Sequence, residues 1–212
     1  VMHRVSSFNK VVQVMKEQVS LPPHPRYFSY LPLTHVAERI GIKTLCTYSG
    51  GSLSFPESLE TFAEDLEFVQ PQIFLGVPRI WQKFKEKILE KLPQEKLNVL
   101  LKIPVVSGLI KKKIQKKLGL RKALAFSGAA PMATDLLEWF QKLGITIYQV
   151  YATTEDCLHN HFNLPDQNRF GTCGKPLPEV TVKFSAEDEI LLKTDCITTG
   201  YYKNLEKTAE IF

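Results

Sequence analysis

The stretch Gln149-Val150-Tyr151-Ala152-Thr153-Thr154-Glu155 is where an expected strand ends and a polar loop begins. Residues 145–150 form the short apolar run that is typical of a buried strand. The loop that follows offers an aromatic ring, a hydroxyl and a carboxylate within five residues. A ring can stack on a base, a hydroxyl can donate to a phosphate, and a carboxylate can hold Mg²⁺. This loop is therefore the first candidate for a nucleotide site.

A second loop of small residues, Ser127-Gly128-Ala129-Ala130-Pro131, lies about twenty residues earlier and closes another strand-like run at 123–126. A helical pattern over 133–143 connects the two loops, which gives a β-loop-α-β unit. Two such loops, each at a strand end, are typical of an open α/β sheet that binds a nucleotide at its carboxyl edge.

Outward from this unit, the sequence predicts strands alternating with helices, which favours a parallel sheet. We expect helices over 5–19, 34–45, 58–69 and 78–92, with Thr34 as an N-cap and Pro78 at a first helical position. Strands are expected over 27–31, within 46–55 and over 72–77. A hairpin over 180–184 and 189–193 and a final helix from residue 203 follow a turn at 171–176. The predicted fold class is α/β, a mixed, largely parallel sheet with flanking helices (1–170), followed by a small β-rich segment (171–212).

Composition places the chain among ordinary globular proteins. Of 212 residues, 44% are hydrophobic and 23% are charged, so disorder is not expected. No run of about eighteen apolar residues exists, so no transmembrane helix is predicted, and no signal peptide is visible after Val1. The four cysteines are widely spaced without a C-x-x-C pair, which indicates reduced thiols and a cytoplasmic protein.

The net charge of +5 is unevenly distributed. Thirteen Lys or Arg residues and three Glu lie between Lys83 and Lys122, a balance of +10. Within this region we expect Leu109, Ile110, Ile114 and Leu118 to share one helical face, with lysines on the other. The segment 107–122 is thus either a surface helix packed on its own domain or a helix that contacts an anionic membrane peripherally. Nucleic acid is disfavoured as a partner, because no aromatic residues interleave with the lysines.

Six segments, in order along the chain, resemble motifs of the adenylate-forming (AMP-binding) enzymes, and among them the long-chain fatty acyl-CoA synthetases of the bubblegum-like branch. The segment 149–155 is similar to the Y-G-x-T-E signature of that family, and 127–131 to its S-G-[GA]-A-P loop. The other four segments are Tyr30–Arg39 (Y-L-P-L-x-H-x-x-E-R), Phe74–Trp81 (F-x-x-V-P-R-x-[WF]), Gly171–Pro176 (G-x-x-G-x-P), and 190–192 with 200–204 (E-I-x-x-[KR]…G-Y-Y-x-N).

The chain departs from the family pattern at two positions and lacks three of its parts. Ala152 stands where the family has glycine, and Arg39 stands where some members have an aromatic gate. The phosphate-cradling loop T-S-G-T-T-G-x-P-K-G is absent, and so are the T-G-D motif and the small domain with the catalytic lysine. We therefore expect a central piece of a longer enzyme, inactive in isolation.

The resemblance implies an activity, its co-substrates and the residues that serve them. The reaction is activation of a long-chain fatty acid by ATP, with Mg²⁺, to an acyl-adenylate, followed by transfer of the acyl group to CoA. The implied nucleotide-binding residues are Ser127, Gly128, Ala129, Ala130, Pro131, Gln149, Val150, Tyr151, Ala152, Thr153 and Thr154. Among these Tyr151 stacks on adenine and Thr154 donates to the α-phosphate, while Glu155 is the metal ligand. Thr154 and Glu155, with His35, form the implied catalytic set. His35, Gly76, Val77 and Pro78 are the implied acyl-binding residues.

Other interpretations of the sequence remain. The chain can instead be a catalytically dead module that binds an acyl group or a nucleotide and docks on membranes. Each site residue also has a structural alternative: Tyr151 can pack on a helix, Thr154 can cap one, and His35 can be a structural histidine. The spacing of Cys157, His159, His161 and Cys173 is unusual for zinc. Ser127 lacks the G-x-S-x-G context of a hydrolase nucleophile.

Overall fold

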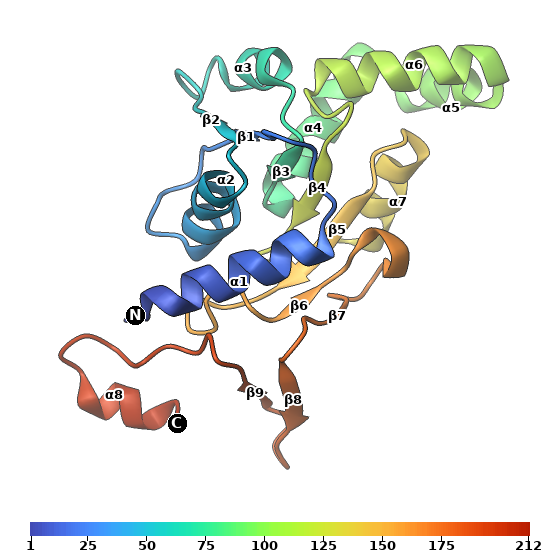
Figure 1. Cartoon of the computed structure of the whole chain (residues 1–212). Coiled ribbons are helices and arrows are strands. Elements are labelled where there is room, and N and C mark those ends of the chain that lie inside the picture. Colours follow the sequence, from blue (N-terminus) through green and yellow to red (C-terminus); the bar gives the residue numbers. More distant parts are fainter.

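A computed structural model, which describes residues 1–212, has one seven-stranded sheet with helices on both sides and a separate two-stranded hairpin (Figure 1). The large sheet has the order β2-β1-β3-β4-β5-β6-β7, parallel from β2 to β5 and antiparallel for β6 and β7. Its strands are β1 (Arg26–Phe28), β2 (Ser52–Ser54), β3 (Ile73–Leu75), β4 (Leu124–Ser127), β5 (Ile147–Tyr151), β6 (His161–Phe162) and β7 (Lys175–Pro176). The hairpin pairs β8 (Thr181–Phe184) with β9 (Ile190–Lys193). The predicted α/β class and the hairpin are confirmed.

The helices are α1 (Val5–Gln18), η1 (Ala37–Thr44, a π-helix), α2 (Leu45–Tyr48), α3 (Phe62–Val69), α4 (Pro78–Lys91), α5 (Gln94–Lys102), α6 (Pro104–Lys117), α7 (Thr134–Lys142) and α8 (Leu205–Glu210), with a short 3₁₀ turn, η2, at Pro165–Gln167. Pro78 and Pro104 occupy first helical positions, where the missing N–H has no helical partner to lose. No helix combines the length and the apolar character that a bilayer-spanning segment needs.

The predicted N-cap at Thr34 is wrong. The helical segment that includes the end of the Tyr30–Arg39 motif begins at Ala37, and no side chain caps it by a hydrogen bond from position 36. Residues 33–35 form a turn instead, in which His35 Nδ1 accepts a hydrogen bond from the Ala37 N–H at 3.2 Å. The turn is closed by the Pro32 carbonyl oxygen, which accepts a hydrogen bond from the His35 N–H at 2.8 Å.

Successive side chains of the central strands point to opposite faces of the sheet and enter two different cores. One face carries Tyr27, Ile73, Phe126 and Tyr148, which pack with α1, η1 and α2. The other carries Phe28, Phe74, Ala125 and Ile147, which pack with α3, α4 and α7. Because both faces are covered, the strands are apolar on both sides rather than alternating with polar residues.

The expected apolar stripe on the lysine-rich helix is partly wrong. Ile110, Ile114 and Leu118 pack against the second core, whereas Leu109 is 64% exposed. A helix turns about 100° per residue, so Leu109 lies far from the stripe whose centre is Ile114. The buried stripe holds α6 on the domain, as the packing alternative predicted, and Leu109 belongs to the outer face.

The first residues of the chain pair with the segment 198–201. Met2 forms an antiparallel bridge with Gly200, and the Thr198 hydroxyl donates to the Met2 carbonyl at 2.7 Å. These contacts bring the first residues and the segment 198–201 next to the loop that follows β5.

Candidate nucleotide and acyl site

The two predicted loops lie side by side at the carboxyl edge of the sheet. Strands β4 and β5 are parallel neighbours, with Ser127 paired with Gln149, so the loops that leave them start at the same level. Gly128 is required at the first loop because a Cβ there would lie 2.7 Å from Val150 Cγ2. The loops can approach so closely only because that side chain is absent.

The first loop turns outward after Gly128. Ala129 has φ of 68°, and Ala129, Ala130 and Pro131 are exposed. Ser127 and Gly128 are buried, and the Ser127 hydroxyl oxygen has no hydrogen-bond partner. The exposed backbone of this loop is therefore free to approach a ligand.

Hydrogen bonds hold the second loop at both ends of the segment 149–155. Gln149 is buried and its carbonyl accepts from the Asn163 N–H at 3.0 Å. Tyr151 is half-buried at the end of β5, opposite His161 in the strand register, with 6.3 Å between the ring centroids. Its ring belongs to neither core.

Asp156 organises the turn that carries Thr153, Thr154 and Glu155. Its carboxylate accepts from the Thr153 N–H at 2.9 Å, the Leu158 N–H at 3.0 Å and the Asn160 side chain at 2.5 Å. Asp156 is fully buried, and this burial raises the pKa of its carboxyl group despite the hydrogen bonds, which lower it. The sequence analysis missed this residue, although Thr153-x-x-Asp156 has the spacing of a capping box.

Thr154 and Glu155 are held from distant parts of the chain. His3 Nε2 lies 2.7 Å from the Thr154 carbonyl oxygen, a contact that leaves the threonine hydroxyl unused. The Tyr201 hydroxyl donates to Glu155 Oε1 at 2.7 Å, and the Thr198 N–H donates to the Glu155 carbonyl at 2.6 Å. His3 and Tyr201 were also missed, because 151 and 46 residues separate them from their partners.

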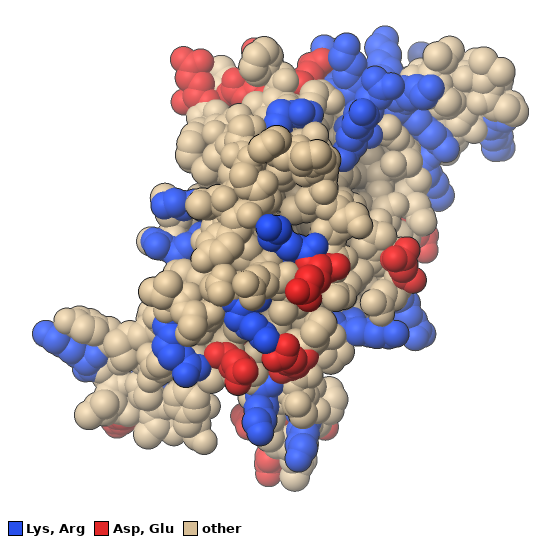
Figure 2. Space-filling model, viewed as in Figure 1, with Lys and Arg blue, Asp and Glu red and all other residues tan.

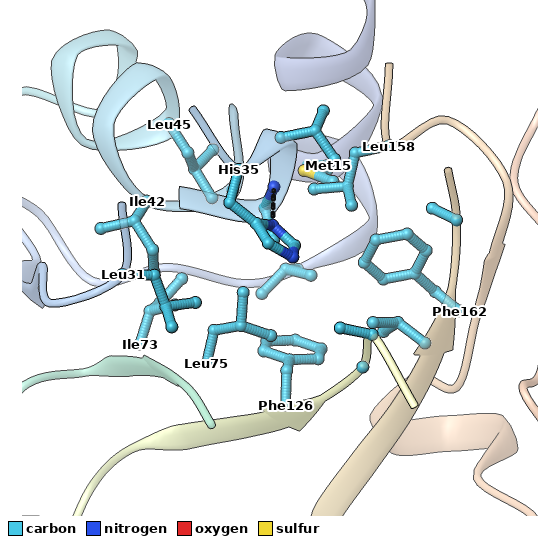
Figure 3. A pocket seen from close by; sticks show the side chains of 18 of the residues that line it. Met15, Leu31, His35, Ile42, Leu45, Ile73, Leu75, Phe126, Leu158 and Phe162 are labelled. Carbon is cyan, nitrogen blue, oxygen red and sulfur yellow. Dashed lines mark hydrogen bonds between the residues drawn. The ribbon is translucent and has the colours of Figure 1, made fainter. Parts of the chain in front are cut away.

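Below the two loops lies an apolar cavity (Figure 3). It is lined by 22 residues, of which 18 are hydrophobic, contributed by α1, η1, α2, β3, β4, β5 and the loops between them. The predicted site residues that line it are His35, Val77, Gly128, Ala129, Val150 and Ala152. The His35 ring lies over the cavity with Nδ1 held by the Ala37 N–H, so its other nitrogen is the one available to a ligand.

Two of the predicted acyl-binding residues lie outside this lining. Gly76 accepts a hydrogen bond at its carbonyl from the Trp81 indole N–H at 2.9 Å, and a Cβ on Gly76 would lie 2.7 Å from that nitrogen. Pro78 opens α4. The cavity wall is instead extended by Leu31, Ile42 and Phe162, which the sequence analysis did not single out.

The carboxylate of Glu155 stands alone as a candidate metal ligand. No group of three or more His, Cys, Asp or Glu side chains is arranged to hold a metal ion. His159 and His161, weighed above as zinc ligands, lie 2.6 Å from Thr194 and Asn160 respectively, and burial lowers the pKa of both rings. A single carboxylate suits Mg²⁺ that is held mainly by substrate phosphates.

Glu38 holds the turn that carries His35. The side chain is fully buried, one oxygen accepts from the Leu31 N–H at 3.3 Å, and the other oxygen has no partner. Burial raises the pKa of the Glu38 carboxyl group. Because the folded pKa exceeds the unfolded one, the unfolded state holds fewer protons between the two values, and stability falls as the pH rises through that interval.

Glu38→Gln should therefore stabilise the chain more at pH 7 than at pH 4, because the amide removes the cost of burying a charge. Urea unfolding at both pH values measures the difference between variant and parent. Glu187→Gln, on the exposed turn between β8 and β9, is the matched control. A Glu38→Gln difference that is independent of pH, or that shrinks as the pH rises, would contradict the assignment.

Comparison with known proteins shows the family of this chain. Residues 1–202 match the family model described as AMP-binding enzyme. The chain is 26% identical to "Long chain acyl-CoA synthetase 3" of Arabidopsis thaliana, with 100% of this chain and 37% of that protein covered. It is 32% identical to "Long-chain-fatty-acid--CoA ligase ACSBG2" of Xenopus laevis, with 86% of this chain and 29% of that protein covered. The chain thus spans about a third of the length of these relatives.

The fold is found in solved structures as well. The anthranilate CoA ligase AuaEII in complex with anthranoyl-AMP superposes with a TM-score of 0.72 at 18% identity, over 98% of this chain and 39% of that one. The similarity extends through the parallel sheet and into the β-rich segment. The chain belongs to the AMP-binding enzyme family.

Proposed function

We propose that this chain forms the nucleotide- and acyl-binding part of a long-chain fatty acid–CoA ligase. In the proposed reaction a fatty carboxylate attacks the α-phosphate of ATP, which releases pyrophosphate and leaves an acyl-adenylate. The thiol of CoA then displaces AMP to give the thioester. The observation that carries the proposal is that residues of both small-residue loops line an apolar cavity, and that His35 lines the same cavity.

The loops suit the nucleotide half of the substrate. We assign Tyr151 to stacking on adenine and the backbone of 127–131 to the adenine and ribose. Gln149, Val150, Ala152 and Thr153 shape the second loop. The Thr154 hydroxyl donates to the α-phosphate. Attack of one anion on another needs positioning and charge neutralisation more than an acid–base pair, and these groups supply positioning.

Glu155 is the residue we assign to Mg²⁺. When bound, the ion would neutralise charge on the phosphates. Tyr201 occupies one carboxylate oxygen and fixes the rotamer, so the second oxygen is left to face the phosphates.

The cavity suits the acyl half. We assign its apolar wall, including Val77, to the hydrocarbon chain, and His35 to the carboxylate end, where its free nitrogen can donate. Gly76 and Pro78 do not contact the hydrocarbon chain in this assignment. They affect its binding indirectly, because Gly76 positions Trp81 and Pro78 begins α4. The names of the relatives, which are long-chain acyl-CoA synthetases and ligases, support a long-chain substrate.

Tyr151→Ala should weaken binding of a non-hydrolysable oleoyl-adenylate analogue by about 5- to 150-fold, since stacking on a base contributes about 1–3 kcal/mol. Isothermal titration calorimetry on the 212 residues measures it. Tyr151→Phe keeps the ring and should bind as the parent does. Tyr48→Ala, an exposed tyrosine of α2, is the control. AMP alone should bind more weakly than the acyl-adenylate analogue, because the cavity stays empty.

Absence of binding by the parent chain, or equal binding by Tyr151→Ala, would contradict the proposal.

We also infer that these 212 residues bind without turnover, because they include no phosphate-cradling loop, T-G-D motif or lysine domain. Formation of acyl-CoA by this chain alone would overturn that inference. A catalytically dead binding module is the competing function, and failure of a longer gene product that includes these missing parts to form acyl-CoA from fatty acid, ATP and CoA would favour it.

A further inference from the structure

Helices α5 and α6 form a hairpin that projects from the rest of the molecule (Figure 1). They are joined at Ile103 and Pro104, with one residue between the helices. The inner face of α6 packs on the second core through Ile110 and Ile114, and Ser107 is buried beside them. The base of the hairpin is fixed by the Lys117–Glu67 ion pair at 2.9 Å and by Gln70, whose side chain donates to the Lys116 carbonyl.

The outer face of this hairpin is apolar near its end. Val99, Ile103, Val105 and Leu109 are 61%, 46%, 77% and 64% exposed. On α6, Val105 and Leu109 are four residues apart and share a face, which is opposite the buried stripe. None of the four contributes to either core.

Lysines continue the same face toward the body of the protein. Lys112 and Lys116 follow Leu109 at helical spacing, and Lys113 lies beside them, all three exposed. Residues 94–117 contain seven lysines and one glutamate, a net charge of +6. Figure 2 shows this separation: the projecting end is mostly uncharged, and blue side chains gather behind it.

An apolar tip with a band of cations behind it matches the layers of an anionic bilayer surface. Valine, leucine and isoleucine side chains gain free energy by entering the acyl boundary, and lysines at the headgroup level are attracted by anionic lipids. A nucleic acid would meet the lysines but leave the apolar tip in water, and no aromatic side chain lies among these residues to stack on bases.

We propose that the α5–α6 hairpin docks the protein on an anionic phospholipid surface, with Ile103, Val105 and Leu109 inserted and Lys112, Lys113 and Lys116 at the headgroups. This docking surface overlaps the segment 107–122 expected from the sequence, with the same lysines, but of the expected apolar stripe it includes only Leu109. It is independent of the proposed ligase activity, since none of its residues lines the cavity or the loops.

Co-sedimentation with vesicles tests the docking. The chain should pellet with vesicles of phosphatidylcholine mixed with phosphatidylserine and stay in solution with phosphatidylcholine alone. Val105→Asp/Leu109→Asp should lower the partition coefficient about tenfold or more. Lys112→Glu/Lys116→Glu should lower it about 30-fold or more, since each lysine near the surface contributes about a fivefold factor. High salt should weaken the parent.

Control variants distinguish docking by the hairpin from non-specific adsorption through other exposed apolar residues and from an effect of net charge. Phe68→Asp alters an exposed aromatic of α3, and Lys142→Glu/Lys183→Glu makes the same change in net charge elsewhere. Both should bind as the parent does, and circular dichroism should show that every variant is folded. Failure of the parent to pellet, equal loss in the controls, or unchanged binding by the hairpin variants would overturn the proposal. So would tighter binding to an RNA duplex than to vesicles.

A fluorescence measurement reports insertion directly. Cys173 is the exposed cysteine, so Cys173→Ser provides the background for site-specific labelling. An environment-sensitive dye on Val105→Cys should shift to the blue on anionic vesicles, and the same dye on Glu187→Cys should not. Equal spectra with and without vesicles at position 105 would contradict insertion.

Discussion

Trp81→Ala is expected to lower the free energy of unfolding by about 3–5 kcal/mol, which is a large fraction of the stability of a typical domain. The indole is fully buried and meets the rings of Phe74, Phe84 and Phe140 edge-on, at centroid distances of 5.5, 5.8 and 5.3 Å. Alanine would leave a cavity between the sheet and α4 that these rigid rings cannot fill. It would also leave the buried Gly76 carbonyl without its donor.

Two further variants help to interpret this loss of stability: one separates the hydrogen bond from the packing, and the other is a control at an exposed site. Trp81→Phe keeps most of the apolar volume and loses the hydrogen bond to Gly76, so we expect a loss of about 1–3 kcal/mol. Phe68→Ala removes an aromatic side chain that is 90% exposed and should change stability by less than about 0.5 kcal/mol. Chemical denaturation measures all three. A Trp81→Ala loss no larger than that of Phe68→Ala would show that the indole is not packed as described.

The motif that contains Trp81 illustrates what the sequence could predict. The sequence predicts a strand over 72–77 and a helix beginning at Pro78; the structure confirms both elements, with the strand shortened to Ile73–Leu75. The assignment of Gly76 to an acyl tunnel came from the resemblance. In the structure its lack of a side chain lets the indole approach its carbonyl. A residue of a family motif can thus stabilise the packing behind a site without lining the site itself.

Errors in the predicted elements have local causes. The strand expected over 27–31 ends at Phe28, although the Ser29 N–H still donates to the Ser54 carbonyl at 2.9 Å, and the chain enters the turn at 33–35 soon afterwards. Leu109 was grouped with Ile110 because both are apolar, although adjacent residues on a helix point about 100° apart. Periodicity gives the type of an element more securely than its ends or its phase.

The contacts that organise the nucleotide loop were harder to predict from the sequence. Asp156 is adjacent to the signature and carries a capping-box spacing, so it could have been found. His3 and Tyr201 could not, because their partners Thr154 and Glu155 are distant in the sequence and only the fold brings them together. Similarly, the apolar cavity combines α1 with β4 and β5, and no local pattern shows that these elements share a core.

Gly174→Ala is expected to destabilise the chain by about 4 kcal/mol or more, or to unfold β6 and β7 locally. Gly174 has φ of 84°, a conformation that costs a residue with a side chain about 1–3 kcal/mol. In addition, a Cβ there would lie 2.0 Å from the Phe162 carbonyl oxygen and 2.2 Å from the Asn163 nitrogen. These are backbone atoms of the adjacent strand, so they can move only if the β6–β7 pairing breaks.

Two other glycines provide matched controls. Gly171 has φ of 75°, but the nearest atom to its Cβ would be Thr134 Oγ1 at 3.5 Å, so Gly171→Ala should cost only the conformational part. Gly108, inside α6, has no atom within 4 Å of its Cβ, so Gly108→Ala should stabilise by about 0.5–1 kcal/mol. Urea unfolding of the three variants should follow this order, with Gly174→Ala the least stable. Because β6 lies opposite Tyr151 in the sheet, Gly174→Ala should also weaken acyl-adenylate binding. Equal stability of the Gly174 and Gly171 variants would contradict the backbone clash, and with it the close pairing that supports the loop after β5.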